Sequence, residues 1–472
     1  MVLPEFFNSF KTKESIQTKQ SVWLLLLQAI LLIPVVLGYT LELIIGMAVI
    51  GMVFYFFNSI ENAIILTPLF IYMPVTVSSS MNIQVSEIGI VLLILVYAST
   101  TLTSKQKRPF ETPALFPILL FICAALLSLV NAKFITAGVK QVLRMVEAFI
   151  VVFYLTVNYI EKKETMIKAL KVIIISGVLA ALYGFYQFKV GGEMTMGAER
   201  RIFGLLGGGY GAFIGSSIVC AVSLFVFQEN RWEKGFLVLS LPFLVVALLL
   251  HQGRAWFVGV FAALLLTLFL IPNRKSLFRF IALFLGVGTS VLFLLNTNLI
   301  GFAPKRAVEF ATVTSFQFGL TPEENKGKFL SILTRFFLWS RGFGIFMKHP
   351  ILGFGIGNLR FRNMITGELG DPSEEGMGQI DNQYLNVLVE TGILGFVSWM
   401  GILFVLYKAS RKLLDNAVDW DGKTIASAVI GSLVVFFLGG LFWCITVTHE
   451  MMVMFAFLMG LLYAGIRLQR QQ

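Results

Sequence analysis

The chain has 472 residues, of which 57% are hydrophobic and only 13% are charged, and its mean hydropathy is +0.83. A soluble domain carries roughly a quarter charged residues, so this composition excludes an ordinary soluble protein and indicates a polytopic membrane protein. The formal net charge is +11. In a membrane protein, basic residues first determine orientation, so we expect membrane lipid as a partner and no nucleic acid.

Apolar runs of about 17–25 residues recur from residue 21 to the C-terminus, and each is long enough to cross a bilayer as a helix. The sequence predicts an all-α polytopic membrane protein with about 14 transmembrane helices (12–14), which form a single integral membrane domain over 1–472. The predicted spans lie at 21–38, 41–57, 62–78, 86–102, 113–130, 141–160, 168–189, 211–228, 235–251, 255–271, 278–297, 385–407, 425–446 and 450–467. The three cysteines all fall inside apolar runs and are interpreted as small core residues.

Basic residues alternate between the connections in a way that predicts cytoplasmic N- and C-termini. Segments such as "SKQKRPFE" (104–111) and "EKKETMIKALK" (161–171) are rich in lysine and arginine, while the short connections on the other side are not. The long connection at 298–384 then lies on the outer side. Its stretch "RFFLWSRGFGIFMKHP" (335–350) has the pattern of an amphipathic helix, so we expect a partly helical extracytoplasmic loop with a function.

Arginines gather on the predicted outer face. Each of them alone is best explained as a solvated charge or a headgroup contact. Together they make one face of the bundle cationic at bilayer depth, where guanidinium groups suit the phosphates of a lipid-linked diphosphate. The residues are Arg200 and Arg201, Arg254 beside a sharp turn between two spans, and Arg335, Arg341, Arg360 and Arg362 in the long loop.

Two glycine-rich stretches, "GLLGGGYG" and "GFGIGN" (353–358), have two interpretations. They permit close helix packing and tight turns, or they bring bare backbone N–H groups to a phosphate. Packing is favoured by two to one on composition alone. Gly353 and Gly355 are retained as substrate-binding candidates.

The outer face offers few proton acceptors. Asp381 stands where a predicted span begins, with Asn382 and Tyr384 directly after it, and residues of these types at a helix start are also ordinary caps. Glu390 lies deeper, where a carboxylate needs a partner. His349 and the pair His449–Glu450 carry lower weight. With three scattered histidines we expect no metal and no cofactor.

One ordered set of motifs resembles the O-antigen ligase/polymerase superfamily, whose members handle undecaprenyl-diphosphate-linked glycans at the outer face of the bacterial inner membrane. The resemblance covers about 200–400. The motifs are "RIFGLLGG" (201–208), "QGRAW" (252–256), "RFFLW" (335–339), "HPILGFGIGN" (349–358) and "DNQYLNVLVETGILG" (381–395).

The resemblance implies a GT-C-like fold, and it implies that Arg201 and Arg254 contact the diphosphate or the reacting sugar. It also implies that Arg335 and the loop glycines shape the cover of the site. Ligases of this family usually carry histidine before the asparagine of the last motif, where this chain has Asp381. That difference favours a polymerase, with Asp381 either as the general base or as a helix cap.

The leading hypothesis is therefore an inverting, metal-independent glycosyltransferase of the inner membrane. It would polymerise undecaprenyl-diphosphate-linked oligosaccharide repeat units, which serve as both donor and acceptor, into a surface polysaccharide. A chain-length regulator and a flippase are the expected protein partners. The alternatives are an O-antigen ligase that transfers the glycan to another acceptor, and a flippase for the lipid-linked unit. The long outer loop and the lack of two similar halves count against the flippase.

Overall fold

A computed structural model describes most of the chain after residue 50. The described residues are 51, 55–72, 76–78, 83–104, 112–190, 195–196, 199–200, 209–227, 231–251, 253–271, 274–296, 322–362 and 380–470. Contacts divide the chain into two units, Met1–Ala63 and Ile64–Gln472. The predicted span 21–38 and most of 41–57 lie outside the described residues.

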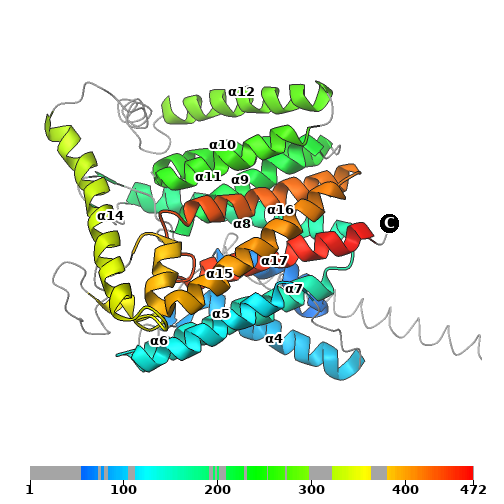
Figure 1. The fold of residues 1–472 in the computed structure, drawn as a ribbon. Coiled ribbons are helices and arrows are strands. Elements are labelled where there is room, and N and C mark those ends of the chain that lie inside the picture. The colour runs from blue at the N-terminus through cyan, green and yellow to red at the C-terminus, as the bar shows by residue number, and fades with distance from the viewer. Residues whose placement is uncertain are drawn as a thin grey trace, which may run out of the picture. The chain divides into compact units, whose positions relative to one another are not determined.

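Helices make up nearly all of the described chain (Figure 1). The α-helices are α3 (Ile60–Ile71, which begins in the first unit), α4 (Val85–Ser104), α5 (Leu115–Ser128), α6 (Ile135–Val146), α7 (Phe153–Tyr159), α8 (Lys163–Val190), α9 (Tyr210–Phe227), α10 (Arg231–His251), α11 (Arg254–Phe269), α12 (Arg274–Asn296), α14 (Pro322–Lys348), α15 (Gln383–Asp415), α16 (Trp420–Gly439) and α17 (His449–Arg470). Two 3-10 turns, η1 (Leu129–Asn131) and η4 (Leu359–Phe361), and a π-helical segment, η2 (Glu147–Val152), complete the helical elements.

Two short hairpins are the described β-structure. Strand β1 (Thr76–Ser78) pairs antiparallel with β2 (Ile83–Gln84), and β3 (Thr195–Met196) pairs antiparallel with β4 (Glu199–Arg200). Each hairpin connects two helices, so neither forms a layer of its own.

Seven segments among the described residues are long and apolar enough to cross a membrane. They are Ile135–Tyr159, Lys163–Gln187, Tyr210–Phe227, Lys234–His251, Gln383–Asp415, Trp420–Gly439 and His449–Arg470. Five shorter apolar helices accompany them, at Ile60–Ile71, Ser86–Thr101, Leu115–Asn131, Ala255–Phe269 and Ser276–Val291. The prediction of an all-α polytopic membrane protein is confirmed, while the count of about 14 spans stays a prediction.

At the centre of the bundle, glycines on some helices leave room for large side chains from neighbouring helices. Helix α9 packs against α8, α10, α11 and α16, and all but one of its residues are buried. The indole of Trp256 from α11 is buried there against two glycines of neighbouring helices. A Cβ on Gly211 would lie 2.7 Å from Trp256 Nε1, and a Cβ on Gly439 would lie 2.7 Å from Trp256 Cη2. Close approach at glycine is how helices pack without a solvent-driven force in lipid.

Two expectations are corrected in detail. The predicted span 425–446 ends too late, because α16 stops at Gly439. Residues 440–448 form a turn that contacts the start of α15 through the hydrogen bond from Gln383 N to Gly440 O. Apolar residues such as Phe442 and Ile445 extended the hydropathy signal past the helix end. Cys220 and Cys444 are buried as expected, but Cys123 is exposed, because it lies on the outward face of α5 with Leu126 and Leu127.

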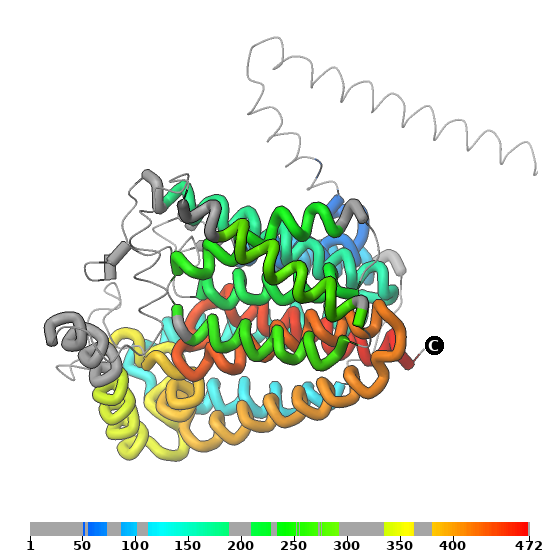
Figure 2. The backbone as a smooth tube through the Cα atoms, turned by 90° about the horizontal axis from the view of Figure 1, so that it is seen from above, coloured from blue at the N-terminus to red at the C-terminus, as the bar shows by residue number. Residues whose placement is uncertain are grey.

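The long connection is partly helical, as predicted. Its amphipathic stretch belongs to α14, which packs against α15. Figure 1 shows α14 running across the ends of the long helices rather than alongside them, and Figure 2 shows the same crossing from a second side. After α14 the chain turns through 349–358 and η4, and the described chain resumes at Ile380, just before α15.

Candidate functional site

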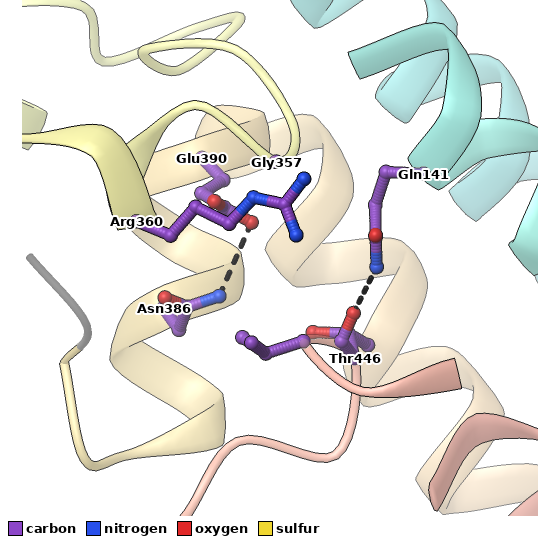
Figure 3. Close-up of a pocket in the computed structure, with 7 residues that line it drawn as sticks. Gln141, Gly357, Arg360, Asn386, Glu390 and Thr446 are labelled. Atoms are coloured by element: carbon purple, nitrogen blue, oxygen red, sulfur yellow. Dashed lines mark hydrogen bonds between the residues drawn. The ribbon is translucent and has the colours of Figure 1, made fainter. Parts of the chain in front are cut away.

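A small polar pocket lies near the first turns of α15 and α17, beside the middle of α6. It is lined by Gln141 of α6, Gly357 and Arg360 of the long loop, Asn386 and Glu390 of α15, and Thr446 and Val447 just before α17 (Figure 3). The N-terminal end of a helix carries a partial positive charge and favours anions. The pocket therefore combines helix ends, a guanidinium and a carboxylate in one place.

Helix α15 presents Asn386 and Glu390 on one face, because residues four apart lie above one another on a helix. Asn386 Nδ2 donates to Glu390 Oε2 at 3.2 Å, and both side chains are buried. Two residues later Gly392 has φ +67°, which interrupts the helix. The interruption frees backbone carbonyls next to Glu390 for the long loop.

The segment 353–357 fills the space beside that interruption. Gly353, Gly355 and Gly357 all have positive φ, a conformation that side chains rarely adopt. Phe354 N donates to the carbonyl of Val389 at 2.8 Å, and Gly355 N donates to the carbonyl of Glu390 at 3.0 Å. These N–H groups are engaged within the protein, which favours the packing interpretation of Gly353 and Gly355 over direct phosphate binding.

The carboxylate of Glu390 accepts hydrogen bonds from the residues that follow in this segment. Backbone N–H groups of Gly357 and Leu359 donate to it, the latter to Oε1 at 3.4 Å. The guanidinium of Arg360 lies beside the same carboxylate (Figure 3). Glu390 thus has the partners that a buried carboxylate requires, and through them it holds Arg360 at the pocket.

A second anchor fixes the loop to the α5–α6 corner. Asn358 is fully buried; its Oδ1 accepts from Phe134 N at 2.7 Å, and its Nδ2 donates to Ile356 O at 3.0 Å. Ser128 Oγ accepts from Ile356 N at 3.0 Å. The loop is therefore clamped between α15 and the start of α6, which places Gly357 and Arg360 opposite Gln141.

The far wall is made by α6 and the turn before α17. Gln141 Nε2 donates to the carbonyl of Thr446. Thr446 N donates to Gln383 Oε1 at 3.0 Å, and Gln383 N donates to Gly440 O at 2.7 Å. The turn is thereby tied to the first residue of α15, so the walls of the pocket are joined by direct hydrogen bonds.

Asp381, the predicted catalytic residue, stands just before α15 and is partly buried. Burial raises the pKa of its carboxyl above the ordinary value, and the positive charge of Arg335 on α14 opposes that rise. Arg335 lies with its guanidinium 6.0 Å from the ring centre of Phe442. The structure thus couples these two predicted residues electrostatically.

Asn382 and Tyr384 have structural contacts. Asn382 is the N-cap of α15, and its side chain accepts from Tyr384 N and Leu385 N at 3.0 Å each. Tyr384 OH donates to Phe437 O at 3.1 Å and ties α15 to α16. Their assignment to substrate binding stays a prediction, as does the assignment of the two loop glycines.

The remaining predicted arginines are not brought to the pocket by any described contact. Arg341 is exposed on α14, with its guanidinium 5.3 Å from the ring centre of Phe337. Arg254 is the first residue of α11 and Arg200 ends β4, but their side chains lie outside the described part of the structure. Arg201 lies outside the described residues altogether.

A polar cluster of titratable groups lies on α4, α6, η2 and α17. His449 Nε2 lies 3.0 Å from Glu147 Oε2, Ser86 Oγ donates to Glu450 Oε1 at 3.2 Å, and Arg144 contacts Glu87 at 2.7 Å. Within the described ranges, no group of three or more histidine, cysteine or acidic residues could hold a metal ion. His449 and Glu450, which carried low weight as candidates, therefore have partners within the bundle.

Sequence reasoning missed four side chains of the pocket, Gln141, Asn386, Thr446 and Val447, and named Arg360 only as one cation among several. Asn386 carried a usable signal, because an amide four residues before a carboxylate shares its face of a helix. Gln141 and Thr446 are separated by 305 positions, and no local pattern relates them.

These features define the class as a polytopic membrane protein with an arginine–carboxylate pocket at one end of its bundle. Residues 239–400 match the family model described as O-antigen ligase. The teichuronic acid biosynthesis protein TuaE of Bacillus subtilis (strain 168) is 24% identical over 336 residues, which are 66% of this chain. The match spans 63% of that relative, less than two thirds of its length. Together the two findings confirm the resemblance of this chain to the O-antigen ligase/polymerase superfamily that its motifs indicated.

Proposed function

We propose that this protein is a membrane glycosyltransferase that joins lipid-linked oligosaccharide repeat units into a polysaccharide. The family match and the similarity to a polysaccharide biosynthesis protein support the coarse role. The observation that carries the finer proposal is the pocket in which Arg360 and Glu390 lie side by side, near the first turns of α15 and α17. A diphosphate leaving group needs positive charge that is already in place, and a pocket of this kind supplies it.

The proposed donor and acceptor are undecaprenyl-diphosphate-linked oligosaccharides. In an inverting transfer, the acceptor hydroxyl attacks the anomeric carbon while the bond to the diphosphate breaks, and the hydroxyl proton passes to a base. Arg360 would stabilise the charge that develops on the leaving diphosphate, because a guanidinium stays protonated and forms bidentate bonds to phosphate. Arg201, Arg254 and Arg335 are proposed to share this role, which makes the reaction metal-independent.

Asp381 is the proposed general base. Its carboxyl is partly buried, and its raised pKa makes it a stronger proton acceptor than a solvated aspartate. Glu390 is proposed to act through Arg360, because its carboxylate is already occupied by Asn386 and by backbone N–H groups.

The setting is proposed to be the bacterial cytoplasmic membrane, with cytoplasmic termini, about 14 spans in a GT-C-like arrangement and the pocket on the outer side. The charge pattern of the connections supports this orientation. A flippase must deliver the repeat unit to that side, and a chain-length regulator is the second proposed partner.

A ligase is the second candidate, favoured by the match of residues 239–400 to a family model described as O-antigen ligase. It would use the same donor and the same pocket, but it would transfer the finished glycan once to a different acceptor. The presence of Asp381 where such ligases carry histidine favours the polymerase.

The test is reconstitution of the purified protein in lipid with a synthetic undecaprenyl-diphosphate repeat unit and a chelator. A ladder of products is expected, and Arg360→Ala should slow its formation by about 10- to 100-fold. A single transfer to an added acceptor without a ladder would identify the ligase. Movement of the substrate across the bilayer without any transfer would refute both enzymes.

A further inference from the structure

Helix α14 carries two different apolar faces. The first packs inward, where Ile345 joins Phe354, Leu359, Ile380 and Val389 in a buried cluster, with Leu338, Trp339 and Phe346 of α14 at its edge. The second points outward. Phe336, Phe343 and Met347 are 59%, 51% and 62% exposed, and their spacing of seven and then four residues places them on one stripe.

The outward stripe is bordered by basic residues. Arg341 and Lys348 are exposed and seven residues apart, so they form a row beside the stripe, and Phe337 lies in that row beneath the guanidinium of Arg341. Phenylalanine and methionine on one strip with lysine and arginine next to it is the pattern of a helix that lies in the membrane interface. A water-soluble surface would not leave three such large apolar side chains exposed on a single stripe.

The exposure of this stripe matches that of residues on the spanning helices that face outward. Phe261 of α11 and Val397 of α15 are 64% and 61% exposed, and lipid covers such positions in a membrane protein. Unlike those helices, α14 crosses the ends of the bundle (Figure 1). An apolar stripe on a helix in that orientation suits the boundary between headgroups and acyl chains, where an anionic lipid also satisfies Arg341 and Lys348.

We propose that the outward stripe of α14 is embedded in the headgroup–acyl boundary of the bilayer, with anionic lipid bound along its basic row. This proposal does not depend on the proposed activity. It has a consequence for the pocket, because the inner face of α14 packs on Leu359, Ile380 and Val389. These three residues are the direct neighbours in sequence of Arg360, Asp381 and Glu390, respectively. The depth of α14 in the interface therefore sets the depth of the pocket.

The test uses the full-length protein in nanodiscs, with the exposed Cys123 replaced by serine and single cysteines introduced for an environment-sensitive fluorophore. Phe343→Cys and Met347→Cys report on the stripe. Val397→Cys is the matched control within the acyl region, and Asn416→Cys at the exposed end of α15 is the aqueous control. Each label is quenched in turn by nitroxide on lipid headgroups, by nitroxide deep in the acyl chains and by aqueous iodide.

The stripe labels should be quenched most strongly by the headgroup nitroxide and several-fold less by iodide than the label at 416. Nitroxide on phosphatidylglycerol should quench them more than nitroxide on phosphatidylcholine, and this preference should disappear in Arg341→Ser/Lys348→Ser. Quenching by iodide as strong as at position 416 would overturn the proposal, because the stripe would then face water. Protection from every quencher would also overturn it, because protein would then cover the stripe.

Discussion

Gly353 and Gly392 interlock: both have positive φ, and a Cβ on Gly392 would lie 2.7 Å from the backbone nitrogen of Gly353. One glycine belongs to the long loop and the other to α15. Their contact lets the loop enter the interruption of the helix and deliver Arg360 to the pocket that Glu390 borders. The position of Arg360 at the pocket therefore depends on this junction.

Gly392→Ala should destabilise the protein by about 1–3 kcal/mol from backbone strain alone, with a further cost from the clash with Ile351. Thermal unfolding in detergent should show a melting temperature several degrees lower. Gly288→Ala is the control, since a Cβ there meets no atom within 4 Å and α12 gains helix propensity. An unchanged melting temperature for Gly392→Ala would mean that the two backbones do not interlock.

Arg360→Ala should reduce the rate of polymer formation by about 10- to 100-fold, because a hydrogen bond to a charged group contributes roughly 1.5–3 kcal/mol. Arg360→Lys should restore only part of the rate, since an ammonium lacks the bidentate fork. The rate is measured from product ladders at saturating repeat unit. Arg411→Ala, in an exposed turn of α15, is the matched control and should leave the rate unchanged.

Asn386→Ala should lower both stability and rate, because it removes the donor that lies 3.2 Å from Glu390 Oε2. An unpaired buried acceptor costs about 1–3 kcal/mol. Combined with Arg360→Ala, the mutation should add little further loss of rate, since both changes act through the same carboxylate. Fully additive losses of rate would show that Asn386 and Glu390 do not act through Arg360.

The rate should fall with acid as Asp381 becomes protonated. A base acts only when deprotonated, so activity is present above the pKa of Asp381 and is lost as the pH falls through it. Burial raises that pKa, and Arg335 holds the rise back. Arg335→Gln should therefore move the acidic limb of the pH–rate profile to higher pH. A limb that stays in place, or one that survives Asp381→Asn, would assign Asp381 to structure alone.

The positions of the seven long apolar helices could be predicted from the sequence because each is a long apolar run, and residue 382 was recognisable as a cap from its type and place. The amphipathic stretch 335–350 is similarly found within α14 and the turn after it. These features are local, and local patterns encode them.

The pocket could not be predicted in the same way. Its far wall depends on the hydrogen bond between Gln141 and Thr446, which joins α6 to the turn before α17. The glycines of 353–357 had two interpretations until their φ values and their partners were known. The predicted span also extended past Gly439, because hydropathy measures apolar character and does not detect the turn that the chain makes there.

The central claim is that the lipid-linked glycan binds beside Arg360 at the opening of the pocket, and photo-crosslinking tests it most directly. A benzophenone amino acid replaces Val447, which lines the pocket, or Val397, which faces outward from α15 as a matched control. The account predicts that a radiolabelled undecaprenyl-diphosphate repeat unit crosslinks through its glycan at 447 and not at 397, and that Arg360→Ala removes the product. Equal crosslinking at both positions, or crosslinking at 447 that survives Arg360→Ala undiminished, would contradict it.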